Sequence, residues 1–203
     1  MVSERKVHTL GSRFSQDVHG IITKPKQAVH TIIEESDLPH SLSVPLFVVI
    51  IAAIMSAIGT DLWGHIFFAT ATTSVILQTL SAIWSGLKLT FRIFYNSFAF
   101  LLIWVMWSVV FHLIGSIVSV TDITRKRTFW TTLKLTGFMF APLFFNVFPR
   151  FDIITGYWSA YIAYHGMKAN YETTGTGALI ITLPYLFSVV FGTFLLVKAL
   201  LGF

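Results

Sequence analysis

The feature that most constrains this chain is a series of long stretches without a formal charge. Four intervals between neighbouring charged residues hold 23, 26, 29 and 25 residues: Asp37–Asp61, Asp61–Lys88, Arg92–Asp122 and Glu172–Lys198. Shorter charge-free runs of 15 residues follow Lys134 and Asp152. Crossing the hydrocarbon core, roughly 30 Å thick, takes about 20 mostly apolar residues. Because lipid offers the backbone no hydrogen-bond partners, each of these segments is expected to be helical.

Composition argues against a soluble domain of this length. Apolar types make up 55% of the 203 residues and charged types 11%, which is about half the charged share of an average soluble chain. Ten of the charged residues fall in residues 1–43, so the following 160 residues carry 13. The net charge of +5 is small, and the basic residues lie between apolar blocks, which indicates lipid headgroups rather than nucleic acid. The chain is therefore interpreted as an integral membrane protein.

The predicted fold class is all-α: a polytopic helical membrane protein with about five transmembrane helices plus an amphipathic interfacial helix. The expected spans are 44–60, 96–120, 130–148, 152–167 and 178–200. With a cytoplasmic N-terminus, this arrangement places ten basic residues inside and four outside, and an excess of Lys and Arg is typical of cytoplasmic loops. The alternative arrangement of six spans places nine basic residues inside and five outside. The expected location is the cell membrane.

The run from Ile66 to Arg92 is the candidate for the interfacial helix. Its polar side chains recur at steps of three or four: Thr70, Ser74, Gln78, Ser81, Ser85, Lys88 and Arg92. This spacing places them on one helical face, and a helix with one polar and one apolar face can lie in the headgroup region. The alternative is a spanning helix whose Ser/Thr stripe packs against its neighbours.

Residues 1–43 are predicted to form a cytoplasmic N-terminal segment, and residues 44–203 the transmembrane domain. Met1–Gly20 lacks the apolar core of a signal peptide. From Pro25 the pattern becomes that of a short amphipathic helix, because proline suits the first helical turn. Its apolar stripe consists of Ala28, Val29, Ile32 and Ile33. This helix is either a solvated lead-in to the first span or an element that docks on a partner.

The sequence contains no arrangement typical of catalysis or of metal and cofactor binding. It has no cysteine, which excludes disulfides, thiol nucleophiles and Cys-ligated metals. It also lacks the HExxH, GxSxG and Walker motifs. No enzymatic activity, catalytic residue, cofactor or metal site is therefore predicted.

The ionisable residues within or at the ends of the expected spans include His112, Lys134 and Lys168. His112 is deep in a span without an acidic partner at that depth, so we expect it to make a hydrogen bond across the bundle; a proton path is the alternative. Lys134 and Lys168 lie at segment ends, where a long ammonium stem can extend to the interface.

Proline and glycine predict how the later helices bend and pack. Pro142 and Pro184 each remove an intrahelical hydrogen bond and clash with the preceding turn, so we expect kinks there. Gly137 and Ala141 are four residues apart, a small-xxx-small pair that lets helices approach closely.

The stretch from Phe129 to Leu143 resembles the Yip family, membrane proteins named for their interaction with Ypt/Rab GTPases. The family pattern there is a glycine, an aromatic residue and, four positions later, a proline. Lys24–Val29 is similar to the proline-containing lead-in of prokaryotic members, and the resemblance covers roughly residues 22–201. The residues that carry the family motifs are Gly137, Phe138, Pro142, Trp158, His165, Gly166 and Pro184.

The resemblance implies a five-span helical domain with a cytoplasmic N-terminus, no enzymatic activity and no cofactor. Eukaryotic relatives act in vesicle traffic, bind prenylated small GTPases and shape membranes. The N-terminal region here is too short for an elaborate GTPase-binding tail, so a prokaryotic member is the better fit. Asp61–Gly64 is similar to a motif that the relatives carry before their first span, but here it follows an apolar segment and is interpreted as coincidence.

Two functional hypotheses follow. The first is a non-enzymatic Yip-like scaffold that organises the membrane or serves trafficking, with the bilayer, anionic headgroups or another membrane protein as partner. The loop of Arg125, Lys126 and Arg127 is its candidate contact for anionic lipid, with ordinary topology setting as the simpler role. The second is a small transporter or channel, with a pathway lined by the Ser/Thr face of residues 70–85.

Overall fold

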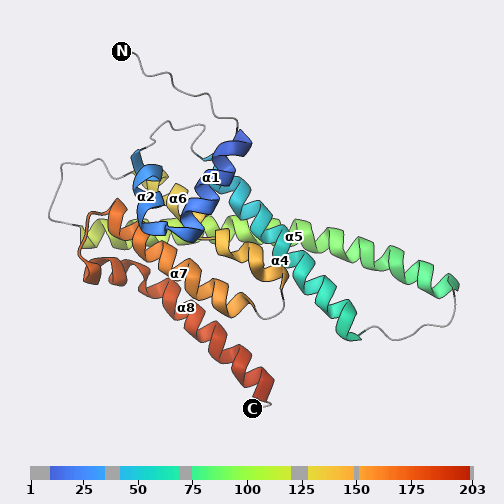
Figure 1. Ribbon diagram of the computed structural model, residues 1–203. Coiled ribbons are helices and arrows are strands. Elements are labelled where there is room, and N and C mark those ends of the chain that lie inside the picture. The colour runs from blue at the N-terminus through green and yellow to red at the C-terminus, as the bar shows by residue number, and fades with distance from the viewer. Residues whose placement is uncertain (1–9, 35–41, 69–74, 120–127, 149–150, 202–203) are drawn as a thin grey trace.

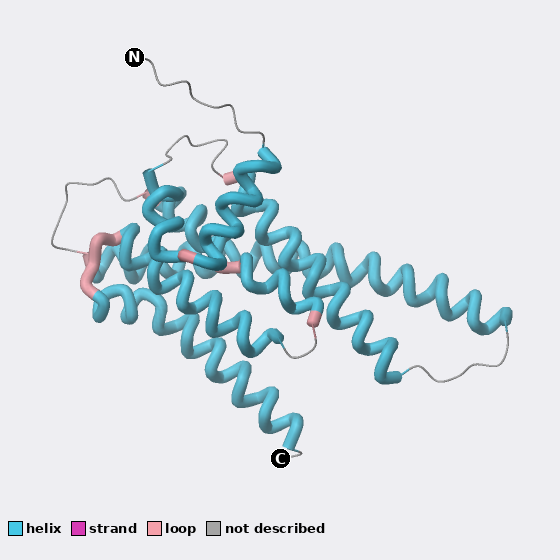
Figure 2. The backbone as a smooth tube through the Cα atoms, viewed as in Figure 1, coloured by secondary structure: helices cyan, strands magenta, loops and turns pink. Residues whose placement is uncertain are grey.

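The computed structural model describes residues 10–34, 42–68, 75–119, 128–148 and 151–201. Every regular element in these residues is a helix, as the sequence predicts, and Figures 1 and 2 show how they are arranged. The elements are α1 (Leu10–Thr23), α2 (Pro25–Glu34), α4 (Ser43–Phe68), α5 (Val75–Val118), α6 (Phe129–Phe138), the 3₁₀ helix η1 (Ala141–Val147), α7 (Phe151–Asn170) and α8 (Gly175–Leu201).

Among the described residues, three helices are long and apolar enough to cross a membrane. The qualifying segments are Ser43–Thr60 of α4, Trp84–Val118 of α5 and Gly175–Lys198 of α8. The remaining two expected spans correspond to α6 with η1 and to α7. Residues 129–147 are split into two shorter helices, and α7 carries more polar side chains than the other long helices. The count of five crossings stays a prediction.

The N-terminal helices α1 and α2 form a hairpin that lies on the bundle (Figure 1). The helix predicted from Pro25 is present as α2. The sequence interpretation missed α1, although its apolar positions have helical spacing. Those positions are Phe14, Val18, Ile21 and Ile22. Both helices bury their apolar stripes against other helices, so α2 is more than a solvated lead-in.

The structure differs from the expected boundary between residues 92 and 96. One uninterrupted helix, α5, runs through this point and is 44 residues long. No proline lies in it, and its glycines, Gly86 and Gly115, are far from the expected break, so nothing in the local sequence stops the helix. Figure 1 shows the first half of α5 and the end of α4 projecting together beyond the bundle.

The expected third span is broken at Pro142. A proline clashes with the carbonyl four residues before it, here that of Phe138, and α6 ends at that residue. The chain then turns through Met139 and continues as η1. Pro184, in contrast, lies inside α8, which continues through it. The two prolines therefore have different consequences: one ends an α-helix and the other is accommodated within one.

The core lies where α4, α6, η1 and α7 meet. From Thr132 to Phe138, every residue of α6 is buried. α7 packs against η1, α6, α2 and α8, so it is the central helix. α5 closes one side of this group and α8 another, and both leave most of their apolar side chains exposed.

Candidate functional site

The buried ammonium of Lys134 joins the N-terminal hairpin to the bundle. Lys134 is 8% exposed, and its Nζ donates a hydrogen bond of 2.8 Å to the carbonyl oxygen of Ile32. Ile32 belongs to the last turn of α2, where carbonyls lack intrahelical partners and the helix dipole favours a cation. Lys134 is therefore buried and caps α2, and the expectation that its stem extends to the interface stays a prediction.

Apolar packing supports this attachment. Val29 and Ile32 of α2 are buried, as are Val18 and Ile21 of α1. α2 lies mainly against α7, while α1 touches α4 and η1. The opposite face of the hairpin is polar and exposed, with Gln16, His19, Lys24, Lys26, Gln27 and His30. The hairpin thus presents a polar surface that is fixed relative to the transmembrane helices.

A second polar cluster ties together α5, α6 and the end of α7. The hydroxyl of Tyr171, a buried residue, is 2.8 Å from Thr132 Oγ1 and 3.1 Å from His112 Nδ1. Asn170 Nδ2 donates to the same Thr132 Oγ1 at 3.1 Å. The prediction that His112 bonds across the bundle is confirmed. Through these hydrogen bonds the cluster holds the three helices together.

Gly137 lets α4 come close to α6. A Cβ at this position would overlap Pro45 of α4 and lie 3.2 Å from Trp104 Nε1. Trp104 in turn donates a hydrogen bond of 2.7 Å to the carbonyl oxygen of Leu133, so α4, α5 and α6 meet here. The predicted close approach at Gly137 is confirmed.

The family-motif residues do not form one site. Gly137, Phe138 and Pro142 are buried together around the end of α6. Trp158 stacks on Phe145 of η1, with ring centroids 6.3 Å apart. The positions of these residues indicate that they set helix breaks and packing.

The other motif residues lie on α7 and α8. The ring of His165 contacts two tyrosines of α7, with its centroid 4.5 Å from that of Tyr161 and 5.2 Å from that of Tyr164. Gly166 is buried at the contact with Leu135 of α6. Pro184 is half-buried in α8. A functional role for any of these residues stays a prediction.

Two predicted features lie outside what the structure describes. Arg125, Lys126 and Arg127, the candidate lipid contact, belong to the undescribed segment 120–127. Most of the Ser/Thr face of residues 70–85 lies in segment 69–74 or has undescribed side chains. The transporter alternative therefore stays a prediction. Of the same helical run, Lys88 and Arg92 are exposed on α5, and Lys88 Nζ lies 5.4 Å from the centroid of the Trp84 ring.

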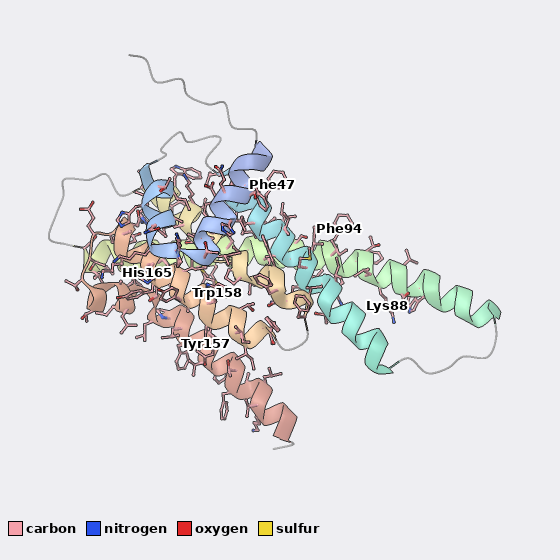
Figure 3. All side chains as sticks on the ribbon, in the orientation of Figure 1. Phe47, Lys88, Phe94, Tyr157, Trp158 and His165 are labelled. Atoms are coloured by element: carbon pink, nitrogen blue, oxygen red, sulfur yellow. The ribbon has the colours of Figure 1, made fainter. Side chains whose placement is uncertain are left out.

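The outer helices present an apolar surface that suits lipid. Figure 3 shows side chains projecting outward along α5 and α8, and Phe94 and Lys88 are labelled on α5. Phe91 is 74% exposed and Phe187 of α8 is 69% exposed. In water a patch of this extent would be costly, whereas in hydrocarbon it costs nothing. Together with three helices of membrane-spanning length, this surface defines the class: the chain is a helical membrane protein in contact with the lipid bilayer.

Comparison with known families identifies the chain more closely. The family model of the Yip1 domain matches residues 20–196. The chain therefore belongs to the Yip1 domain family, as the motifs around Gly137 suggest. No curated protein and no solved structure matches the chain.

Proposed function

We propose that this Yip1-family protein is a non-enzymatic scaffold that organises the membrane around it. The observation that carries the proposal is the attachment of α2 to the bundle through the buried Lys134. It fixes a polar surface, that of the α1–α2 hairpin, on a domain otherwise covered by lipid-compatible side chains. A surface held in this way can present a binding partner to the bilayer at a constant position.

The arrangement also supports a topology. We place the protein in the cell membrane with residues 1–43 as its cytoplasmic segment and residues 44–203 as its transmembrane domain. The basic residues of the N-terminal segment and of Arg125, Lys126 and Arg127 then face the same side, in agreement with the positive-inside rule. At that surface, each of the three loop residues adds about 1 kcal/mol of attraction to an anionic leaflet.

Affinity purification after cross-linking in intact membranes tests the scaffold. We compare the tagged full chain with Lys134→Met and, as a matched control, with Lys198→Met, which changes an exposed lysine at the end of α8. The wild type and the control are expected to retain the same protein or lipid partners, and Lys134→Met to retain fewer. Circular dichroism establishes that the bundle of each variant is still helical.

A direct measurement of membrane shape complements the purification. The full chain is reconstituted into vesicles, and their shape is compared with that of protein-free vesicles by electron microscopy. Unchanged vesicles, together with no partner retained by the wild type, would contradict the scaffold. If the wild type and Lys134→Met retained their partners equally, the docked α1–α2 hairpin would not be the partner-binding surface.

A further inference from the structure

A cluster of basic side chains forms where the start of α2 lies against the last turns of α7. α2 packs on α7, and the ammonium groups of Lys168 and Lys26 both act electrostatically on the ring of His165. Lys26 and Lys168 are exposed, and so is Lys24, which directly precedes α2. Two helices far apart in sequence thus bring like charges to one place.

Aromatic side chains flank the cluster. The ring of Tyr161 meets that of His165 edge to face at 4.5 Å, and the ring of Tyr164 does so at 5.2 Å. Tyr161 is 52% exposed. Tyrosines beside lysines are typical of the boundary between hydrocarbon and water, because the ring sits at headgroup depth while the ammonium stem reaches the charged layer.

The charges that act on the imidazole of His165 come from Lys168 and Lys26, and both are positive. An anion placed between the two ammonium groups would be attracted by both of them. A phosphate group offers several acceptor oxygens for Lys and His donors.

We propose that Lys26, Lys168 and His165 bind the phosphate of an anionic phospholipid headgroup, with Tyr161 against its glycerol backbone. This site is distinct from the loop at Arg125, Lys126 and Arg127. It draws on residues from α2 and α7, so it exists only while the N-terminal hairpin is docked. A bound headgroup would in turn strengthen the docking, because it bridges the two helices. The inference rests on the proposed cytoplasmic orientation only for its access to the inner leaflet.

Native mass spectrometry of the detergent-purified full chain tests the site. The probes are phosphatidylglycerol and phosphatidylcholine at equal concentration. We expect the wild type to retain phosphatidylglycerol in preference to phosphatidylcholine. Removing one lysine should weaken retention about fivefold and the double variant Lys26→Gln/Lys168→Gln about 25-fold. Lys88→Gln and Lys198→Gln, which change exposed lysines on α5 and α8, are the matched controls and should bind as the wild type does.

Further variants and ligands separate the alternatives. Lys26→Arg/Lys168→Arg should restore binding, which a loss through misfolding would not allow. Free glycerol phosphate should compete only weakly; full competition would indicate a soluble phosphorylated ligand and overturn the lipid. The site would be overturned if the wild type and the double glutamine variant retained phosphatidylglycerol equally. It would also be overturned if the control variants lost as much of the lipid as the double variant does, or if the protein bound an acidic peptide in preference to the lipid. Since the assay is done in detergent, a wrong orientation would not affect it, so failure of the scaffold proposal can be recognised separately.

Discussion

The interior of this bundle and its outer helices differ in the polarity of the side chains that they bury and expose. Of the eight buried polar residues among the described part of the chain, six lie on α6 and α7. α5 and α8, in contrast, leave most of their apolar side chains exposed. In water this distribution would be inverted. In lipid, apolar contact gains nothing over the solvent, so helices associate through close packing and hydrogen bonds.

The comparison explains how the hairpin is held. A charged side chain inside a membrane bundle is costly unless it is paired, and Lys134 finds its partner in the end of α2. The same lysine facing lipid would have to reach the interface, which is the position we expect for Lys168, exposed near the end of α7. One residue type therefore has two roles, which are set by the side of the helix on which it lies.

The largest expected effect comes from truncating a ring in the interior. Phe138 is fully buried at the end of α6. Phe138→Ala should lower the free energy of unfolding by about 3 kcal/mol, the low end for such a change, because lipid lacks the water-exclusion contribution. Unfolding in detergent titrations, followed by tryptophan fluorescence, measures it. The matched control, Phe187→Ala on α8, should change the value by less than about 0.5 kcal/mol; equal losses at the two sites would abolish the distinction.

A smaller effect is expected where backbones touch. A Cβ on Gly59 of α4 would overlap the backbone of Asn146 and Val147 in η1, and a backbone cannot move aside as a flexible side chain can. Gly59→Ala should therefore lower the free energy of unfolding, measured in the same titration, by about 1–3 kcal/mol. Gly192 of α8 has open space around it, so Gly192→Ala should be neutral or slightly stabilising. A neutral Gly59→Ala would show that α4 and η1 are not in contact.

The smallest expected change in the free energy of unfolding comes from removing one hydroxyl of the polar cluster of Tyr171, Thr132 and His112. Tyr171→Phe removes the hydroxyl that joins Thr132 and His112 but keeps the ring. We expect the free energy of unfolding to fall by about 1 kcal/mol, since hydrogen bonds between membrane helices contribute only modestly to stability. Tyr157→Phe, which changes an exposed tyrosine of α7, is the control and should have no effect. If Tyr157→Phe costs as much as Tyr171→Phe, the cluster does not hold the helices together.

Much of the fold could be predicted because lipid imposes simple rules on sequence. The charge-free runs located α4, the last part of α5, and α8, and Pro25 marked the start of α2. Pro142 was expected to kink a helix and instead ends it, because η1 can continue the path in a tighter form. The boundary near residue 96 was wrong, since charges such as Lys88 and Arg92 do not stop a helix whose side chains are exposed.

The candidate sites were harder to predict, because they depend on contacts between distant segments. Lys134 and Ile32 are separated by 102 positions, and no local pattern tells a lysine that extends to the interface from one that caps another helix. The cluster at Lys26 and Lys168 likewise forms only when α2 lies on α7. One signal was available: the apolar stripe of α2 needed a surface to cover it, and a central helix rich in small and polar residues, α7, supplies that surface.

Hydrogen exchange of the α2 amides, measured by mass spectrometry on the full chain in lipid nanodiscs, tests the account most directly. In the wild type, α2 should exchange as slowly as the buried part of α7, because it is docked. Lys134→Met should increase α2 exchange by about 5-fold to 150-fold, the equivalent of leaving a buried carbonyl without its partner. Lys198→Met, which changes an exposed lysine of α8, should leave α2 exchange unchanged. Exchange in wild-type α2 as fast as in an isolated peptide would contradict the docked hairpin and the scaffold built on it.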